Sequence, residues 1–561
     1  MELAQASRRL EFAVLTGRDH LLSHGFDAHI AYLSAALAVG SQVDTDTAIE
    51  LARIFLEGYL EVEDPHLTYA SEVTRQVLYL RAKLPSALVD GAMCVALSAL
   101  ASAGRVPQTI NLDEFAFLLK LHGTTQTILS LVGNDYVPRD QALYLLGCAL
   151  EWGKLLASEV SETHLASVDA SFLPLVRWGD RVSGARWEQI TPPWTFASEP
   201  LQTSPSVNDH AGTQTVRMQS RGFRLAHFER ATATGGSSLT RIGDDVGYCD
   251  FLDYEQSASA SCASDSLLAG FSGGSGLVRE NHGDALPPIK VAISLLGSVN
   301  LEHGHLVLDT LSRLAALEGA GLADIPILID ESPNTNAICF ISRFVDIERL
   351  VVIPRGSRVR VDRLVRPLPT TYSPPGINDW DLCIPGVAPW DPRGFEFVQQ
   401  RMRPSRSLKQ PPRRVFIYRE ASNQRRALRN QQELVELTRR FGYESVDPGG
   451  LSADAQMALF ADANHIIVQS GAAAFNVIAC HQDTKIAVLI GDDLSNWRGF
   501  ASPVAQAVDE ITFITGVSLR RPIPDWQVPF EIAECDLLHV LERWHAQDSQ
   551  PMAPNPNSQL V

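Results

Sequence analysis

Apolar residues follow a helical period through the first third of the chain. They recur at spacings of three and four up to about residue 175, and strand-like runs are almost absent there. One apolar face repeating every 3.6 residues or so predicts amphipathic helices. The predicted helices are Ile30–Ala38, Ala48–Leu60, Val73–Leu84, Leu88–Leu100, Phe115–Leu131 and Ala142–Leu156. We therefore predict an all-helical domain at residues 1–177, built as a solenoid or a bundle.

The pattern changes at Lys290, where short and nearly continuous apolar runs begin to alternate with helical stretches. The predicted strands are Lys290–Gly297, Asp324–Asp330, Arg349–Pro354 and Arg363–Leu368, with a helix at His305–Leu317. Parallel strands that are buried on both faces have this appearance. Residues 178 to about 285 are rich in Pro, Ser and Gly and predict loops with a few edge strands. We assign residues 178–395 to a first Rossmann-like domain with an irregular lead-in.

A second set of such runs follows a linker rich in Pro and Trp, from Thr370 to about Pro412. The predicted strands are Arg413–Arg419, Glu444–Pro448, His465–Gly471, Lys485–Gly491 and Glu510–Gly516, and the predicted helices are Asn430–Gly442, Leu451–Ala463 and Ile532–His545. This predicts a second Rossmann-like domain at 396–547, followed by a disordered tail at 548–561. The fold class is therefore α/β, with two Rossmann-like domains and an extra all-α domain at the N-terminus. Ligands of such sheets bind beyond the carboxyl ends of the strands, so the predicted site lies between the two halves.

Composition bears on which partners the protein binds and on the cellular compartment in which it works. The net charge is −18, from 65 acidic and 47 basic residues, which disfavours nucleic acid as a partner. None of the eight cysteines forms a CxxC pair, so neither a zinc site nor a disulfide framework is indicated. We find no signal peptide and no apolar run of the roughly 20 residues that span a membrane. These features predict a cytoplasmic protein, with peripheral contact at the inner face of the membrane left open.

A first cluster of polar residues opens the helix after the first predicted strand, in Gly297–Leu314. His305 and Asp309 are four residues apart and so share one helical face, while Asn300 and His303 precede them. A histidine or a carboxylate at the end of a strand can act as a general base on a sugar hydroxyl. The alternative is an ordinary helix N-terminus with solvated side chains.

Two further clusters follow strands of the second domain. Arg419 ends one strand, and Arg425, Arg426 and Arg429 come next, so that guanidinium groups could bind a diphosphate. The alternative is a solvated basic face. The other cluster, Ser470-Gly471-Ala472, joins a strand to a helix, where backbone N–H groups can hold phosphate. The alternative there is a glycine needed only for close packing.

Three other patterns carry less weight. GFSGG at Gly270–Gly274 fits the nucleophile elbow of a hydrolase, with Ser272 as nucleophile, but that elbow needs a strand before it and a helix after it. Asp379-Trp380-Asp381 resembles a metal-binding DxD but lies in the linker. No GxGxxG motif follows a strand and no Walker A motif is present, so a dehydrogenase or a P-loop enzyme is disfavoured.

The three clusters, in this order, resemble glycosyltransferase family 61, which includes bacterial capsular polysaccharide biosynthesis proteins. The first motif reads HLVLDTLSRL, with His305, Asp309 and Arg313 in place and Ser312 where proline is usual. The second reads IYREASNQRRALRNQQEL and keeps Arg419, Arg426, Asn430 and Glu433. The third reads LSADAQMALFADANHIIVQSGAAAFN and keeps Gln456, Gly471, Ala472 and Asn476. Ser470 stands where the family usually has a histidine.

The resemblance implies a GT-B fold and an inverting transfer from a nucleotide sugar, with cationic side chains and helix N-termini in place of a metal ion. It implies Asp309 or His305 as the base. It implies the following donor-side residues: Arg419, Arg426, Ser470, Gly471, Ala472 and Asn476. The acceptor-side candidates are Asn300, His303 and Arg313. No cofactor and no metal are implied.

The resulting prediction is a glycosyltransferase that acts on a glycan or lipid-linked glycan in capsule or exopolysaccharide synthesis. The alternative is a non-catalytic scaffold or binding protein, in which the helical domain binds a protein partner and the transferase region is degenerate. Ser470 in place of the family histidine favours that alternative. Binding of a nucleotide sugar discriminates between them.

Overall fold

The computed structural model divides the chain into two compact units. The first comprises Met1–Arg177, Ser237–Asp284 and Leu519–Pro524, and the second Trp178–Gly236, Ala285–Ser518 and Asp525–Val561. The structure describes residues 119, 124–133, 137–151, 153–198, 202–203, 216–243, 245–249, 265–272, 274–280, 283–298, 300–318, 320–332, 335–370, 391–405, 413–419, 427–492, 508, 510–518 and 529–548. The four helices predicted before residue 119 and the tail predicted after Asp548 lie outside these residues. Within them, no helix is long and apolar enough to cross a membrane.

The described part of the first unit combines short helices with a mostly antiparallel sheet. Its helices are α8 (Thr125–Val132), α9 (Arg139–Glu151) and α10 (Glu162–Ser167). Its strands are β1 (Ala170–Val176), β7 (Leu239–Ile242), β8 (Val246–Cys249), β9 (Leu268–Ser272) and β10 (Ser275–Arg279), in the order β7-β8-β1-β10-β9. Helices α8 and α9 overlap the predicted helical stretches Phe115–Leu131 and Ala142–Leu156. Strand β1 corrects the prediction that every residue up to 177 is helical.

The glycine-rich stretch at residues 270–276 serves close packing and a hairpin. A Cβ atom on Gly147 of α9 would lie 1.9 Å from the carbonyl oxygen of Ala269, and one on Gly270 would lie 2.6 Å from Gly147 Cα. Helix α9 can therefore approach β9 only because both positions are glycine. Ser272 ends β9 and pairs with Ser275 of β10 in an antiparallel hairpin. A strand rather than a helix follows it, so the hydrolase elbow at Ser272 is ruled out.

The first half of the second unit is a parallel sheet with antiparallel strands at one side. Strands β11 (Ala285–Ser294), β12 (Ile327–Asp330), β13 (Leu350–Ile353) and β14 (Arg358–Pro367) are mutually parallel, in the order β13-β12-β11-β14. Helix α13 (Thr335–Ile341) connects β12 to β13. All four strands predicted in this region are confirmed. Because β12 and β14 lie on opposite sides of β11, the chain changes direction at the carboxyl end of β11.

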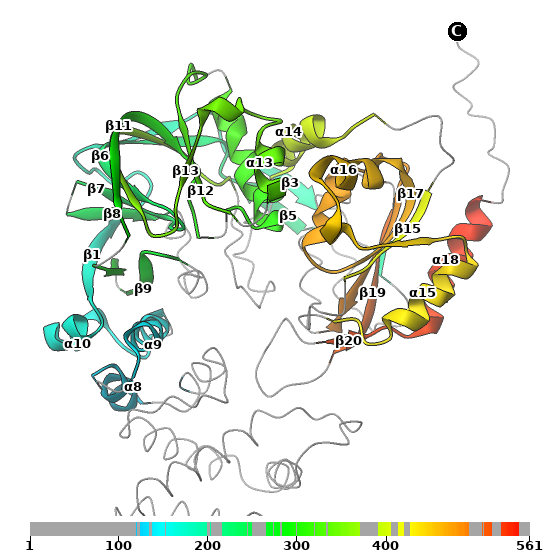
Figure 1. Cartoon of the computed structure of the whole chain (residues 1–561), viewed down its shortest axis with the longest axis horizontal. Helices are drawn as coiled ribbons and strands as arrows, with labels where there is room; N and C mark the ends of the chain where they lie inside the picture. The colour runs from blue at the N-terminus through cyan, green and yellow to red at the C-terminus, as the bar shows by residue number, and fades with distance from the viewer. Residues whose placement is uncertain are drawn as a thin grey trace, which may run out of the picture. The chain divides into compact units, whose positions relative to one another are not determined.

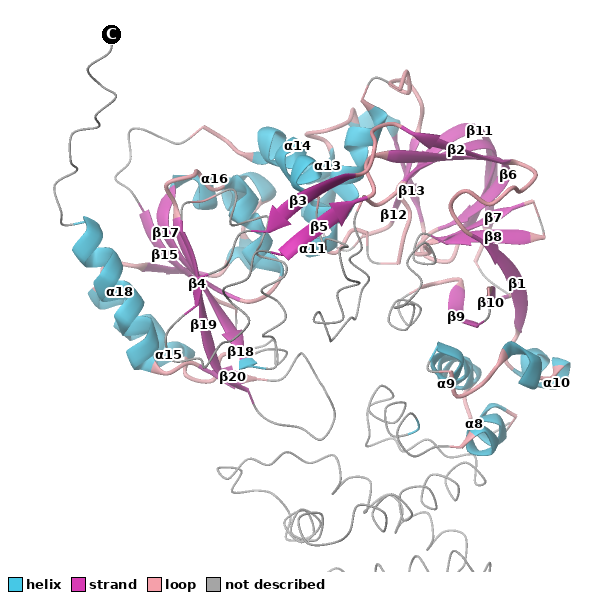
Figure 2. Cartoon of the chain, turned by 180° about the vertical axis from the view of Figure 1, so that it is seen from behind, coloured by secondary structure: helices cyan, strands magenta, loops and turns pink. Residues whose placement is uncertain are grey.

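The lead-in before residue 285 is more regular than predicted. Strand β6 (Arg224–Thr234) pairs antiparallel with β14 and with β2 (Ala185–Gln189), while β3 (Trp194–Ser198) pairs with β5 (Val216–Ser220) (Figure 2). The prediction of mainly loops was wrong here because these strands carry small and charged residues. Arg224 of β6, for example, is buried, and its guanidinium donates to the carbonyl of Pro369 and lies over the Trp178 ring.

The second half of the second unit is a doubly wound sheet. Strands β15 (Arg413–Ile417), β16 (Glu444–Val446), β17 (Ala463–Gln469), β18 (Lys485–Gly491) and β19 (Glu510–Ser518) are parallel, and β20 (Phe530–Glu531) pairs antiparallel with β19. The order β16-β15-β17-β18-β19 is 2-1-3-4-5 in chain order. In sheets of this order the ligand crevice lies at the carboxyl ends of the first and third strands, which are β15 and β17 here.

Helices cover both faces of this second sheet (Figure 1). Helices α15 (Gln431–Arg440) and α18 (Glu534–Asp548) pack on one face, where Phe416, Ile467 and Trp544 share a core. Helix α16 (Ala453–Asp462) and the 3-10 helix η10 (Ala472–Ala479) cover the other face. There Met457 and Val477 join a core that also contains residues of the first half, such as Leu306. The two halves are thus joined through one apolar cluster.

The predicted linker contains a helix. Helix α14 (Pro392–Met402) begins after Asp391, whose carboxylate accepts hydrogen bonds from the N–H groups of Arg393 and Gly394. Proline is favoured in the first turn of a helix, so Pro392 initiates this helix rather than breaking it. Residues 371–390 and 406–412 of the predicted linker lie outside the described residues.

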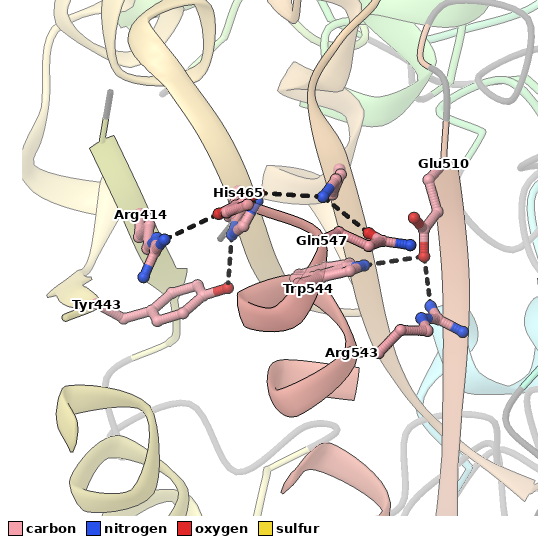
Figure 3. Close-up of polar contacts among 9 residues, drawn as sticks. Arg414, Tyr443, His465, Glu510, Arg543, Trp544 and Gln547 are labelled. Carbon is pink, nitrogen blue, oxygen red and sulfur yellow. Dashed lines mark hydrogen bonds and ion pairs between the residues drawn. The ribbon is translucent and has the colours of Figure 1, made fainter. Parts of the chain in front are cut away.

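A buried polar cluster fixes the C-terminal end of α18 against the amino ends of β15, β17 and β18 (Figure 3). The ring of His465 lies between Tyr443 Oη, 3.2 Å from Nδ1, and Asp548 Oδ2, 3.4 Å from Nε2. Asp548 also pairs with Arg414 at 2.8 Å and with Lys485 at 3.2 Å. Burial lowers the pKa of His465 to about 4, against the opposing effect of Asp548. The folded chain therefore holds a neutral imidazole here.

We expect this histidine to make folding sensitive to acid. The unfolded chain takes up a proton on His465 near its ordinary pKa of 6.5, whereas the folded chain does so only near 4. The neutral His465 contributes about 3 kcal/mol to the free energy of unfolding. This contribution is fully present above about pH 6.5 and is lost as the pH falls toward about 4. Urea unfolding of wild type and His465→Gln at about pH 7 and about pH 4.5 measures this difference. His539→Gln, an exposed site on α18, is the matched control. Equal losses of stability in wild type and His465→Gln would contradict the assignment.

Candidate active site

Hydrogen bonds to two polar side chains, Asp330 of β12 and Asn300 of the loop itself, hold the loop after β11. The carboxylate of Asp330, at the carboxyl end of β12, accepts hydrogen bonds from the N–H groups of Gly236 and Gly297 at 2.5 and 2.9 Å. The buried amide of Asn300 donates to the carbonyl of Leu295 at 2.7 Å. A Cβ atom on Gly297 would lie 2.4 Å from that amide nitrogen. Asn300 thus shapes the loop from which the next helix starts.

The helix that follows contains a widened turn at Asp309. Segments α11 (His303–His305), η5 (Leu306–Thr310), α12 (Leu311–Arg313) and η6 (Leu314–Leu317) run in succession, and η5 is a π-helical turn. Such turns inside helices are frequent at functional sites. Asp309 is bound through both oxygens by Arg313, with Nε–Oδ1 at 3.1 Å and Nη2–Oδ2 at 2.5 Å. Both side chains are largely buried, so a bidentate ion pair fixes the orientation of Asp309.

His305 lies within the electrostatic reach of this pair. Burial lowers the pKa of His305, Asp309 and Glu302 oppose that effect, and Arg313 adds to it. The sequence predicted that His305 and Asp309 share one helical face, and the structure adds Arg313, which binds Asp309. Two of the three residues of the first motif, Asp309 and Arg313, therefore form an ion pair whose charges act on the third, His305.

Arg419 and Gly471 meet at the carboxyl ends of β15 and β17. Gly471 has φ +148° and ψ −170°, a region of backbone space that is essentially confined to glycine. A Cβ atom at this position would lie 2.0 Å from Nη2 of Arg419, so the guanidinium rests directly on the glycine. The two residues thus stand together at the point where the order of this sheet predicts a ligand.

Arg419 is a cation that forms no direct ion pair among the described residues. Its side chain is half-buried, and it forms no hydrogen bond or ion pair with any residue of the described ranges. Burial lowers its pKa, and the carboxylate of Asp447 opposes that shift from a longer distance. A guanidinium remains charged in proteins, so a half-buried and unpaired one is suited to an anionic ligand.

The backbone beside Arg419 offers further donors. Helix η10 begins at Ala472, directly after Gly471, and the first N–H groups of a helix have no partner within it. Ser470 is fully buried, and its hydroxyl has no hydrogen-bond partner among the described residues. Both features favour an anion at this turn. Arg426, the other predicted donor-side arginine, lies outside the described residues.

One chain of hydrogen bonds connects the sites of the two halves. His303 Nε2 lies 2.6 Å from Asn476 Oδ1, and Asn476 Nδ2 donates to Gln456 Oε1 at 3.0 Å. Beside this contact, Gly304 and Phe475 touch so closely that a Cβ atom on Gly304 would lie 2.8 Å from the phenyl ring. The helix start of the first half is therefore in direct contact with η10, the helix that begins at the glycine turn of the second half.

Two contributors were not among the residues predicted for the site. Gln456 was noted only as a position kept in the third motif, and Asp447 was not noted at all. Gln456 completes the chain of amide hydrogen bonds to His303, and Asp447 is the acid whose charge acts on the pKa of Arg419.

Within the described ranges, no group of three or more His, Cys, Asp or Glu side chains is placed to hold a metal ion. Independence from metal stays a prediction.

Comparison with known proteins supports a glycosyltransferase. The family model described as Glycosyltransferase 61 matches residues 303–487. The matched stretch begins at His303 and includes Asp309, Arg419, Gly471 and Asn476, so it covers the residues that the structure brings together. No curated protein matches the chain.

Proposed function

On the premise of this match, we propose that the chain transfers a sugar from a nucleotide-sugar donor to a hydroxyl group of a glycan acceptor. The observation that carries the proposal is the Arg419–Gly471 contact, because it leaves a half-buried cation unpaired among the described residues at the carboxyl edge of a doubly wound sheet. A diphosphate is an anion of suitable size and charge for such a place.

The donor-side roles follow from the chemistry of the leaving group. As the bond from the sugar to the diphosphate breaks, negative charge develops on the phosphate oxygens, and fixed donors stabilise that charge. Arg419 supplies the cation, while Gly471 and Ala472 supply backbone N–H groups at the start of η10. Ser470 offers a buried hydroxyl beside them. Arg426 is proposed to assist from the segment after Arg419.

The acceptor side is proposed to lie at the start of the helix after β11. There His303 is half-buried beside Asn476, and His305 lies near Asp309 and Arg313. A single displacement with a base on the acceptor hydroxyl inverts the sugar configuration. Asp309 and His305 are the bases that the resemblance implies, although the ion pair to Arg313 occupies both oxygens of Asp309.

We further propose that the two parallel sheets form a GT-B pair and that the product is a capsule, exopolysaccharide or related glycan made in the cytoplasm. Residues 401–414 form a basic run, of a kind that can contact an anionic membrane surface or a lipid-linked acceptor. Three of its arginines are paired within the described residues: Arg401 with Glu318, Arg413 with Glu444 and Arg414 with Asp548. Those pairs favour a structural role for them.

A screen of UDP-, GDP- and TDP-linked sugars by thermal shift and by donor hydrolysis tests the proposal. A donor that binds the folded chain stabilises it, by about 2.7 kcal/mol at 100 times its dissociation constant. We expect stabilisation by one nucleotide class together with slow release of nucleoside diphosphate. A scaffold with a degenerate transferase region, as the Ser470 substitution suggests, would bind none of them.

Variants of the charged helix sharpen the same test. If Asp309 or His305 is the base, as the resemblance implies, Asp309→Asn or His305→Ala loses transfer while keeping donor binding, because neither residue is proposed to contact the diphosphate. Binding is measured by calorimetry and turnover by release of nucleoside diphosphate. Turnover at the wild-type level in both variants would remove them from the mechanism.

A further inference from the structure

The orientation of the Gln456 side chain is fixed by two backbone carbonyl groups. Its Nε2 donates to the carbonyl oxygens of Pro448 at 3.0 Å and of Leu451 at 3.1 Å. Both partners are acceptors only, so the nitrogen of the amide must face them and the oxygen must face the other way. Gln456 Oε1 is consequently an acceptor, 3.0 Å from Asn476 Nδ2.

This orientation is passed on to His303. Because Asn476 Nδ2 donates to Gln456, Asn476 turns its Oδ1 toward His303 Nε2, 2.6 Å away. An amide oxygen only accepts, so Nε2 of His303 must carry the proton. In a neutral imidazole the lone pair is then on Nδ1, which forms no hydrogen bond with any residue of the described ranges.

The surroundings of His303 keep the ring neutral. Burial lowers the pKa of His303, and the hydrogen bond to Asn476 only partly opposes this. The neighbours on the packed elements are uncharged: Phe340 of α13 at 5.2 Å between ring centroids and Asn476 of η10. Glu302, its neighbour in the chain, is exposed, and no charged group of the described residues contributes to the shift. A histidine that acts as a general base near neutral pH must be neutral, so that one ring nitrogen can accept a proton.

The position of His303 relative to Arg419 suits a displacement. Asn476 lies five residues beyond Gly471, on which the guanidinium rests, so a rise of 2.0 Å or so per residue in η10 places the Asn476 backbone about 10 Å along the helix from Gly471. That length is on the scale of a monosaccharide joined to a phosphate. Asp309, by contrast, has both oxygens bound to Arg313.

We propose that His303 is the catalytic base, with Asn476 and Gln456 as positioning residues that hold its tautomer; this rests on the proposed function. The acceptor hydroxyl gives its proton to Nδ1 of His303 as its oxygen forms the bond to the anomeric carbon. The bond from that carbon to the diphosphate oxygen breaks, and its electron pair leaves with the diphosphate at Arg419. The imidazolium keeps its Nε2–H on Asn476 and afterwards releases the other proton to solvent.

Comparison of His303→Gln with His539→Gln, at an exposed site on α18 where kcat should stay at the wild-type level, tests the assignment. Glutamine can still donate to Asn476 but has no basic nitrogen. We expect His303→Gln to lower kcat for hydrolysis of the active nucleotide sugar, in which water replaces the acceptor, by about 100-fold to 1,000-fold. Its dissociation constant for UDP or GDP should change less than twofold. Asn476→Ala should lower kcat about tenfold at unchanged KM, because the tautomer is no longer held. Wild-type kcat in His303→Gln would overturn the assignment.

The tautomer of His303 can also be measured directly in the wild-type protein, without an assay of turnover. The ¹⁵N shifts of histidine-labelled protein, assigned by loss of one signal in His303→Gln, report the tautomer of His303 near pH 7. We expect a neutral ring with the proton on Nε2 and a mixed tautomer in Asn476→Ala. A ring protonated on Nδ1 would overturn the proposal even if a donor binds. Absence of any nucleotide binding in wild type would instead refute the proposed function.

Discussion

Replacing Arg419 with alanine is expected to weaken the binding of UDP or GDP about 100-fold. The guanidinium is half-buried and forms no direct ion pair in the described parts of the chain, so a bound diphosphate would be its main partner. Removing one partner of a buried, hydrogen-bonded charge pair costs about 2–5 kcal/mol, and partial exposure favours the lower part of that range. Titration calorimetry of the nucleoside diphosphate measures the loss directly.

Two matched variants separate charge from geometry in this experiment. Arg419→Lys keeps the charge but loses the planar fork, so its loss should be smaller than that of Arg419→Ala. Arg440→Ala removes an exposed arginine at the end of α15 and should leave the affinity unchanged. An Arg419→Ala protein that binds within twofold of wild type would exclude this residue from the diphosphate site.

Replacing Gly471 with alanine should impair the same site by a different route. The new Cβ would lie 2.0 Å from Nη2 and 2.5 Å from Cζ of Arg419, so the guanidinium would have to leave its place. That side chain is flexible and can move at little cost, but it would no longer lie at the turn. We therefore expect a loss of nucleotide affinity close to that of Arg419→Ala. The glycine-only backbone conformation adds about 1–3 kcal/mol of lost stability.

A double-mutant cycle shows whether the two residues act together. In the Arg419→Ala background the guanidinium is already absent, so Gly471→Ala should reduce affinity little further. Gly450→Ala is the control, because a Cβ atom there meets open space. Losses that simply add in the double variant would show that Gly471 does not act through Arg419.

The parallel strands of both halves could be predicted because their environment leaves a simple pattern. Strands β12, β17 and β18 are buried on both faces, so runs such as Lys485–Gly491 are almost continuously apolar, and β18 occupies this range. The antiparallel strands before residue 285 lack that signal. Strand β6 carries Arg224, Glu229 and Arg230 among small residues, and its pairing with β14 depends on contacts far along the chain.

The residues of the candidate site could be named from the sequence, but their pairing could not. That Arg419 touches Gly471 follows from β15 and β17 being neighbours, which the order of strands in the chain does not determine. The chain from Gln456 through Asn476 to His303 joins three separate segments, and each amide orientation depends on the one before it. Spacing within a motif carries no information on such contacts.

The structure of the protein with a bound nucleoside diphosphate tests the central claim most directly. We predict that the diphosphate lies within hydrogen-bond distance of the Arg419 guanidinium and of the N–H groups at Gly471 and Ala472, with the position of the sugar on the side of His303. A nucleotide bound elsewhere on the chain, with Arg419 still resting on Gly471 and touching no phosphate oxygen, would contradict the account.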